Sequence, residues 1–432
     1  MKKKLKELLT MVFFLLMGGI IGTFLLVLVY CIPLDKIFFN FSTGVEGMER
    51  NPDWHQFIFD YDATTIDTFT EALMIKASAT PMPPTGENVL QYALRGYTLN
   101  EEQAKHGLHF YEYDWKGKTY TCDSYERYWH GYLVILKPLM YFFSFHDIIF
   151  INVTLQMLML FAILAAIRKN GADRLILPFI CLWLISLQAV IMFGIDYAAC
   201  FYIYAVAVLC LLFNRKIMDR YNYFFMAIGM ATSYMDFLTW PLITLGVPLI
   251  VFIYLRQKEG RLDNVRKIIY ASVFWGIGYI GQWGMKWVIA SFFLKENVLG
   301  DAFSEIGLQS AMADAGNSGE SFSYMQVLER NIGVFAKKPF FLLLCIIVIY
   351  LLYTIIKNRN SLLIKKMMPY AFISLFPFLW YMATKNHSYN HYWMTWRILC
   401  ISIFAIVCGV VAITDKPIMQ REVMTRSNMV TR

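Results

Sequence analysis

The chain has 432 residues, of which 58% are hydrophobic, 17% aromatic and only 16% charged. About a quarter of the residues in a soluble domain are charged, so this composition excludes an ordinary soluble protein and favours an all-α membrane protein with several spans. The net charge of +8 does not indicate nucleic-acid binding, because the basic residues alternate with apolar runs as they do in membrane proteins.

Apolar runs predict about ten membrane-spanning helices within a single membrane domain, residues 1–432. Their approximate ranges are 9–31, 147–167, 175–193, 198–213, 222–236, 241–255, 268–292, 340–356, 369–383 and 398–414. The first run follows a lysine-rich start, is long for the core of a signal peptide and precedes no small-residue cleavage site. We therefore interpret it as a retained first span.

Lysine and arginine gather in alternate segments between these runs. The segments expected on the same side of the membrane as the N-terminus carry more than half of the 39 basic residues. The short turns around Ile195 and 237–239, expected on the other side, carry none. The positive-inside rule therefore places both termini in the cytoplasm of a protein integral to the plasma membrane. Three longer segments are expected outside, at 32–146, 293–339 and 384–397.

The first outer segment contains an acidic stretch that predicts a helix at the membrane surface, over about 62–77. On such a helix Asp60, Asp67 and Glu71 would share one face, and Asp62 would suit the N-cap. These four carboxylates are the candidate catalytic residues, with Asp67 or Asp60 preferred as the base. The alternative is the solvated face of an amphipathic helix.

A second interfacial helix is expected over about 125–143, in the sequence YERYWHGYLVILKP and the residues after it. Its spacing would place a cationic stripe beside aromatic anchors at the membrane surface. The candidate substrate-binding residues here are Tyr125, Arg127, Trp129, His130 and Lys137.

The other two outer segments and two short turns complete the outer face. The segment 384–397 is rich in aromatic residues and supplies three further candidates for substrate binding, which are His387, His391 and Arg397. For Arg397 the alternative is an arginine that snorkels to the interface. The segment 293–339 predicts a mobile lid or a simple connector. Asp196 and Asp236 lie in short turns. We expect these two residues to stabilise the turns rather than to line an outer cavity.

These residue types suit a substrate with a phosphate head, a sugar and a lipid tail. Basic side chains neutralise phosphate oxygens, aromatic rings pack on sugar faces, and a carboxylate accepts a proton from an acceptor hydroxyl. Asp60, Asp67 and Glu71 could also hold a divalent cation such as Mg²⁺ or Mn²⁺, and the sequence leaves metal-bound and metal-free action open.

The order of these features resembles the GT-C class of membrane glycosyltransferases, in a bacterial branch. The resemblance rests on the acidic stretch 60–74, on 125–138 and on NHSYNHYWMTWR at 386–397. It implies a first outer segment with two juxtamembrane helices and a catalytic acid, a polyprenyl-phosphate-linked sugar donor, and a cell-envelope polysaccharide or glycolipid acceptor. The acidic stretch lies farther from the first span than is usual in that class, which leaves the base open between Asp60, Asp62 and Asp67.

We therefore expect a glycosyltransferase that acts at the outer face. One alternative is a transporter or flippase for a lipid-linked sugar, which would be expected to show charges inside its spans and internal repeats. Lys286 is the main charge within a predicted span, and no repeat of halves is evident. The other alternative is a membrane acyltransferase that uses a histidine of the outer segments.

Overall fold

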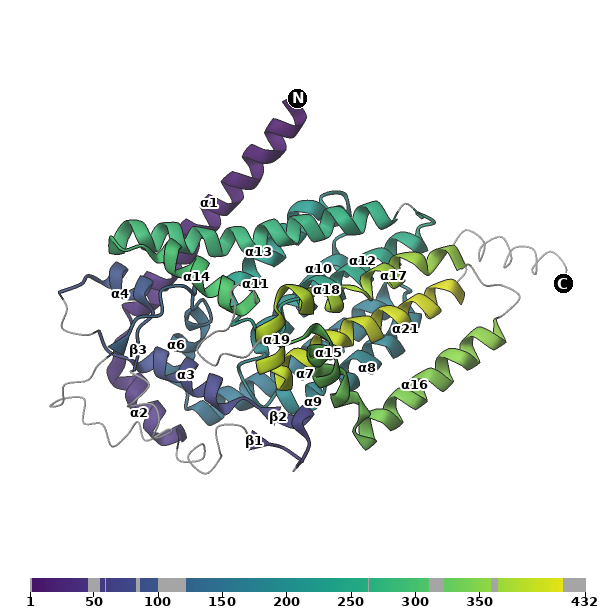
Figure 1. Ribbon diagram of the computed structural model, residues 1–432, viewed down its shortest axis with the longest axis horizontal. Coiled ribbons are helices and arrows are strands. Elements are labelled where there is room, and N and C mark those ends of the chain that lie inside the picture. The colour runs from purple at the N-terminus through teal and green to yellow at the C-terminus, as the bar shows by residue number, and fades with distance from the viewer. Residues whose placement is uncertain are drawn as a thin grey trace.

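The computed structural model describes residues 2–45, 55–58, 60–82, 86–99, 122–262, 264–310, 322–358 and 364–414. In this part of the chain helices predominate, and the only sheets are two short antiparallel ribbons (Figure 1). The expected all-α fold class is confirmed.

Every apolar run forms a helix. Eight runs are unbroken: α1 (Lys2–Tyr30), α7 (Phe145–Lys169), α10 (Ala198–Phe213), α11 (Tyr221–Met235), α12 (Ile243–Lys258), α13 (Asn264–Leu294), α16 (Lys338–Lys357) and α21 (Cys400–Thr414). The other two are divided into α8 (Ile176–Ile185) with α9 (Gln188–Ile191), and α17 (Met368–Ile373) with α18 (Phe376–Ala383). Leu187 adopts a left-handed conformation at the first break, and Pro377, which has no N–H to donate, follows the second.

Four of the described helical segments are long and apolar enough to cross a membrane. They are Lys4–Tyr30, Phe145–Lys169, Lys338–Lys357 and Tyr392–Thr414. Several long helices also expose large apolar side chains, such as Phe24 on α1, Phe150 on α7 and Ile349 on α16, each at least 59% exposed. Exposed apolar surface on this scale is expected where helices face lipid rather than water.

The shorter elements gather mainly at one end of the long helices (Figure 1). Those of the first long segment are α2 (Leu34–Val45), β1 (His55–Gln56), the 3₁₀ turn η1 (Asp62–Thr64), β2 (Thr65–Ile66), α3 (Thr68–Ala79), α4 (Val89–Arg95), β3 (Thr98–Leu99), β4 (Cys122–Asp123) and α6 (Leu133–Phe142). Strand β1 pairs with β2, and β3 pairs with β4. The later segments add α14 (Val298–Ser310), α15 (Tyr324–Gly333), α19 (Lys385–Asn390), α20 (Tyr392–Thr395) and the 3₁₀ turn η8 (Trp396–Leu399).

The acidic helix begins later than the sequence pattern predicts. After the 3₁₀ turn that ends at Thr64, the β-branched residues Thr65 and Ile66 adopt extended backbone and pair with β1, so the helix α3 starts only at Thr68. Its N-cap is Asp67 rather than Asp62, because the Asp67 carboxylate accepts a hydrogen bond from the Thr70 N–H at 2.9 Å. The predicted helical row that joins Asp60 to Asp67 and Glu71 is therefore wrong.

The second predicted surface helix is also shorter than expected. Residues 125–132 form turns, and α6 begins at Leu133. His130 has a positive φ of 52°, and the N–H of Gly131 donates to the Tyr234 carbonyl, so the backbone here packs against α11 instead of coiling. Arg127, His130 and Lys137 consequently do not share a helix face.

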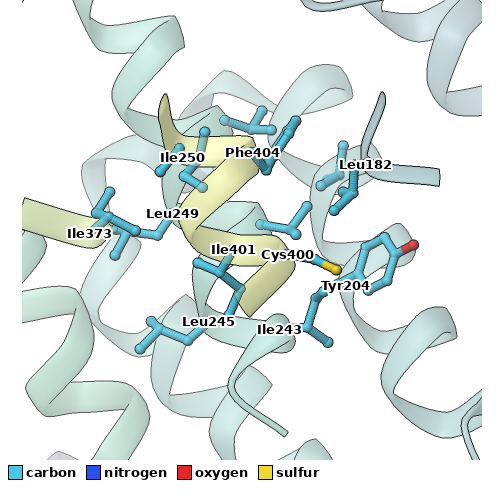
Figure 2. Close-up of a cluster of buried hydrophobic side chains, with 14 of the residues drawn as sticks. Leu182, Tyr204, Ile243, Leu245, Leu249, Ile250, Ile373, Cys400, Ile401 and Phe404 are labelled. Carbon is cyan, nitrogen blue, oxygen red and sulfur yellow. The ribbon is translucent and has the colours of Figure 1, made fainter. Parts of the chain in front are cut away.

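The core of the bundle surrounds α21. Cys400, Ile401 and Phe404 pack against side chains of α8, α10, α12 and α17 (Figure 2). Gly246 permits a close approach, since a Cβ at that position would lie 2.6 Å from Cγ2 of Ile401. This packing fixes α21 and the turn η8 that precedes it, and so fixes one wall of the site described below.

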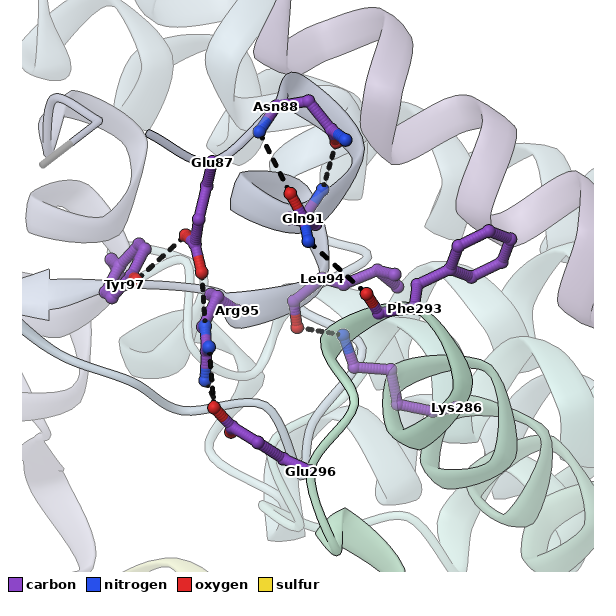
Figure 3. A network of polar contacts seen from close by, with 9 residues as sticks. All are labelled: Glu87, Asn88, Gln91, Leu94, Arg95, Tyr97, Lys286, Phe293 and Glu296. Carbon is purple, nitrogen blue, oxygen red and sulfur yellow. Dashed lines mark hydrogen bonds and ion pairs between the residues drawn. The ribbon is translucent and has the colours of Figure 1, made fainter. Parts of the chain in front are cut away.

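A polar network fastens α4 to the end of α13 (Figure 3). Arg95 donates to Glu87 at 2.9 Å and to both carboxylate oxygens of Glu296 at 2.6 and 2.7 Å. Lys286, the charged residue in a predicted span, is buried and donates to the Leu94 carbonyl at 2.6 Å, where it satisfies an acceptor at the end of α4.

Candidate functional site

Three carboxyl groups from two distant parts of the chain meet beside the N-terminus of α3. We call Asp67, Glu71 and Asp196 the acidic cluster. Glu71 Oε1 accepts a hydrogen bond from the Ile195 N–H at 2.6 Å, and a Cβ added to Gly194 would lie 2.8 Å from Asp196 Oδ1 and 3.0 Å from Glu71 Oε1. All three side chains are at most 3% exposed. The short turn between α9 and α10 thus brings Asp196 next to Asp67 and Glu71, which belong to the first long segment.

Burial changes the ionisation of this cluster. Burial raises the pKa of Glu71 to about 8, with the Ile195 N–H opposing the shift and the charge of Asp67 adding to it. Burial, then Glu71 and Asp67, raise the pKa of Asp196 well above its ordinary range, while the nearby Arg397 lowers it. Near neutral pH both Glu71 and Asp196 therefore favour the protonated form.

Asp67 is the member of the cluster that faces the aromatic segment 384–397. Its Oδ2 accepts from the Thr70 hydroxyl at 2.9 Å and lies 3.4 Å from the Trp393 indole nitrogen. The His391 ring lies 5.2 Å from the Trp393 ring, and its Nδ1 is buried without a hydrogen-bond partner in the described chain. Burial lowers the pKa of His391 and the charge of Asp67 opposes that shift, so a neutral imidazole stands near the carboxylate.

Asp62 lies at the more open edge of the same site. Its carboxylate accepts from Gln56 at 2.9 Å and from the Tyr392 hydroxyl at 3.0 Å. The guanidinium of Arg330 lies 4.1 Å from the centre of the Tyr392 ring and 4.5 Å from that of Tyr389. Arg330 is a half-exposed cation on α15 that the sequence analysis missed, because nothing in its local pattern distinguishes it from other basic residues near a span.

Asp60 does not join the cluster. It occupies an exposed turn with a φ of 60°. Among the described residues, no group of three or more His, Cys, Asp or Glu side chains is placed to hold a metal ion. The set of Asp60, Asp67 and Glu71, named above for a divalent cation, is therefore not assembled in this structure.

Arg397 is completely buried, so its guanidinium does not extend to solvent as that of a snorkelling arginine would. Its Nη1 donates to the Trp393 carbonyl at 2.8 Å and to the Tyr197 hydroxyl at 3.2 Å, and its Nη2 donates to the Ala63 carbonyl at 3.0 Å. These contacts join the first segment, the turn before α10 and the last outer segment around the acidic cluster. Arg397 thereby places a positive charge near Asp196; its contact with a substrate phosphate stays a prediction.

The remaining candidates do not meet the acidic cluster but join elements of the fold. Trp129 donates to the Gln282 carbonyl, and Lys137 donates to the Ser78 carbonyl at the far end of α3. His130 lies between the Tyr125 carbonyl and the Tyr132 hydroxyl, and burial lowers its pKa to about 3.

Two candidates contact other segments of the chain. Arg127 forms an ion pair with Asp301 of α14 at 2.8 Å. His387 pairs with the Leu238 carbonyl, and burial lowers its pKa to about 3.

An apolar groove of about 610 Å³ runs between α6, α7, α10 and α11 and ends next to the cluster. Ile195 joins the two features, because its side chain lines the groove and its N–H bonds Glu71. Met74, one turn of α3 beyond Glu71, also lines the groove. The other lining residues include Leu136, Leu139, Ile148, Leu155, Ala199, Ile203, Val206, Ala227, Ala231 and Met235.

Comparison with known proteins finds no matching family model, no matching curated protein and no matching solved structure.

Proposed function

We propose that the chain is a membrane glycosyltransferase with about ten spans and cytoplasmic termini. It would move a sugar from a polyprenyl-phosphate donor to a surface polysaccharide or glycolipid at the outer face of the plasma membrane. One observation carries the proposal: a buried acidic cluster lies at the end of an apolar groove. An apolar groove suits a prenyl chain, and the acids would stand where the phosphate-linked sugar begins.

The reaction assigns a separate task to each group. The acceptor hydroxyl oxygen bonds to the anomeric carbon, the bond from that carbon to the phosphate oxygen breaks, and the hydroxyl proton passes to Asp67. The polyprenyl phosphate leaves with the bonding electrons and needs no acid, because a phosphate is already a good leaving group. We assign contact with the phosphate to Arg330, a half-exposed cation beside Tyr392 and Asp62.

The decisive experiment replaces one carboxylate at a time by its amide. Asp67→Asn should lower transfer from a panel of polyprenyl-phosphate sugars by about 10²–10⁴-fold, the usual contribution of a general base. Asparagine is as good an N-cap as aspartate, so α3 should be retained. Asp60→Asn is the matched control, because asparagine tolerates the left-handed conformation at this exposed turn, and it should leave turnover unchanged.

Full activity of Asp60→Asn, Asp62→Asn, Asp67→Asn and Glu71→Gln, each tested separately, would remove the first-segment acids from the mechanism. Movement of the donor across the bilayer without transfer would favour the flippase, and dependence on an acyl donor would favour the acyltransferase. Parallel assays with a chelator and with added Mg²⁺ or Mn²⁺ would determine whether a divalent cation takes part.

A further inference from the structure

A second cavity, of about 250 Å³, lies against α13, and six of its lining residues are aromatic. We call it the aromatic pocket. Trp275, Tyr279, Trp283 and Trp287 recur every four residues and so follow one face of α13, and Trp380 of α18 lies opposite. The Trp275 and Tyr279 rings are stacked 4.8 Å apart at 9°, and the Tyr279 and Trp283 rings are 5.3 Å apart.

Two polar features distinguish this pocket from a simple crevice filled by lipid. The indole N–H of Trp283, a lining residue, is buried and has no hydrogen-bond partner among the described residues, which leaves an unsatisfied donor beside the pocket. Arg127 and Thr384 add polar groups to the lining. The ion pair of Arg127 with Asp301 holds α14, whose Ala302 also lines the pocket. Flat rings with a few polar groups are the surface that packs on the C–H faces of a sugar.

A series of contacts connects the aromatic pocket to the acidic cluster. The groove lies along α11 and the pocket along α13, and these helices pack backbone to backbone at Gly229 and Gly278. Leu238 lines the pocket, and its carbonyl lies 3.0 Å from His387 Nε2. The His387 ring is 4.7 Å from the His391 ring. The His391 ring lies next to the Trp393 ring, whose indole nitrogen is 3.4 Å from the Asp67 carboxylate.

The pocket also reaches the lipid-facing surface. Ile280 lines it and is 66% exposed on α13, a predicted span. A ligand anchored in the bilayer can therefore enter from the side, whereas a soluble polysaccharide would have to pass α14 and the segment around Thr384.

We propose that the aromatic pocket is the acceptor subsite and that the acceptor is a sugar-bearing lipid, whose sugar packs on the α13 rings while its next hydroxyl extends toward Asp67. This inference rests on the proposed glycosyltransferase function. It narrows the acceptor from polysaccharide or glycolipid to a lipid-anchored glycan, and it assigns the donor and the acceptor to different cavities.

The test uses full-length protein in lipid nanodiscs, with monoglucosyl-diacylglycerol as the acceptor probe. Trp283→Phe keeps a ring and removes the N–H, and Trp380→Ala removes a wall. Each should raise the KM for the probe at least tenfold and leave acceptor-independent hydrolysis of the donor unchanged. Phe292→Ala, on the same helix but 75% exposed and outside the pocket, is the matched control and should change neither quantity. An unchanged KM in both pocket variants would overturn the inference.

A binding assay separates this inference from the proposed function. A diazirine-labelled monoglucosyl-diacylglycerol should crosslink to residues 275–287 in the unmodified protein and much less in Trp283→Phe, even if no sugar is transferred. Specific crosslinking without any transfer would retain the sugar-lipid site and refute the transferase. Equal crosslinking by a diacylglycerol without sugar would overturn the inference, since the pocket would then bind lipid alone.

Discussion

Replacement of Glu71 by glutamine should stabilise the protein, and more so as the pH rises. Glu71 is buried, and its pKa rises from 4.5 to about 8 on folding. A carboxyl whose pKa is raised in the folded state contributes its full stability below pH 4.5, and loses it as the pH rises toward 8. Glutamine retains an oxygen for the Ile195 N–H and has no proton to lose.

The size of the effect follows from that shift. Each pKa unit corresponds to 1.36 kcal/mol, so the raised pKa of Glu71 lowers the free energy of unfolding by about 3 kcal/mol at pH 7, where the folded state keeps the proton, and by about 5 kcal/mol at pH 9, where the carboxyl is ionised in both states. Glu71→Gln avoids this cost. The variant should match the unmodified protein near pH 4.5 and exceed its stability increasingly toward pH 9.

Thermal unfolding in detergent between pH 5 and pH 9 would measure this difference. The stability advantage of Glu71→Gln over the unmodified protein should increase across the range, because the other buried titrating groups, among them Asp196, His130 and His387, affect both proteins alike. Asp60→Asn, at an exposed turn, should reproduce the unmodified curve. Parallel curves for the unmodified protein and Glu71→Gln would refute the reasoning, because they would mean that Glu71 titrates in the folded state as it does in water.

Two further predictions concern the walls of the site. Arg397→Lys should lower the free energy of unfolding by about 3–5 kcal/mol, because an ammonium cannot replace the planar donors to Ala63, Trp393 and Tyr197 around a buried charge. Thermal unfolding measures this loss, and an unchanged melting temperature would contradict the prediction. Ala231→Trp should fill the apolar groove and raise the KM for a long-chain polyprenyl-phosphate sugar more than the KM for a short-chain analogue. Equal effects on both donors would show that the prenyl chain binds elsewhere.

Helix positions were largely predictable because lipid-facing and core helices have long apolar runs. The run 198–213 matches α10 at both ends. The start of α3 was harder to predict, although Thr64, Thr65 and Ile66 carry a local signal for extended backbone in their β-branched side chains. Two acids five residues apart both suit an N-cap, and only the pairing of β2 with β1 selects Asp67.

The composition of the site was harder to predict than its location. Asp67 and Glu71 belong to one local pattern, but Asp196 is 125 residues beyond Glu71 in a turn that looks ordinary. Its role depends on how α9 and α10 place that turn against α3, which local spacing does not encode. Arg397 illustrates the same limit, because an arginine at the end of an apolar run suggests the membrane surface and this one lies in the core.

The energetics of the acidic cluster bear on why it is present. Glutamine at position 71 could keep the Ile195 hydrogen bond, and asparagine at position 67 could keep the helix cap, so neither contact requires an acid. Glu71 nevertheless destabilises the fold at neutral pH, and groups with strongly perturbed pKa values that cost stability are concentrated at functional sites. The two amide experiments can therefore be combined. If the cluster serves catalysis, the amide variants should be inactive in transfer, and Glu71→Gln should also be more stable than the unmodified protein; if the cluster is only structural, stability and activity should change together.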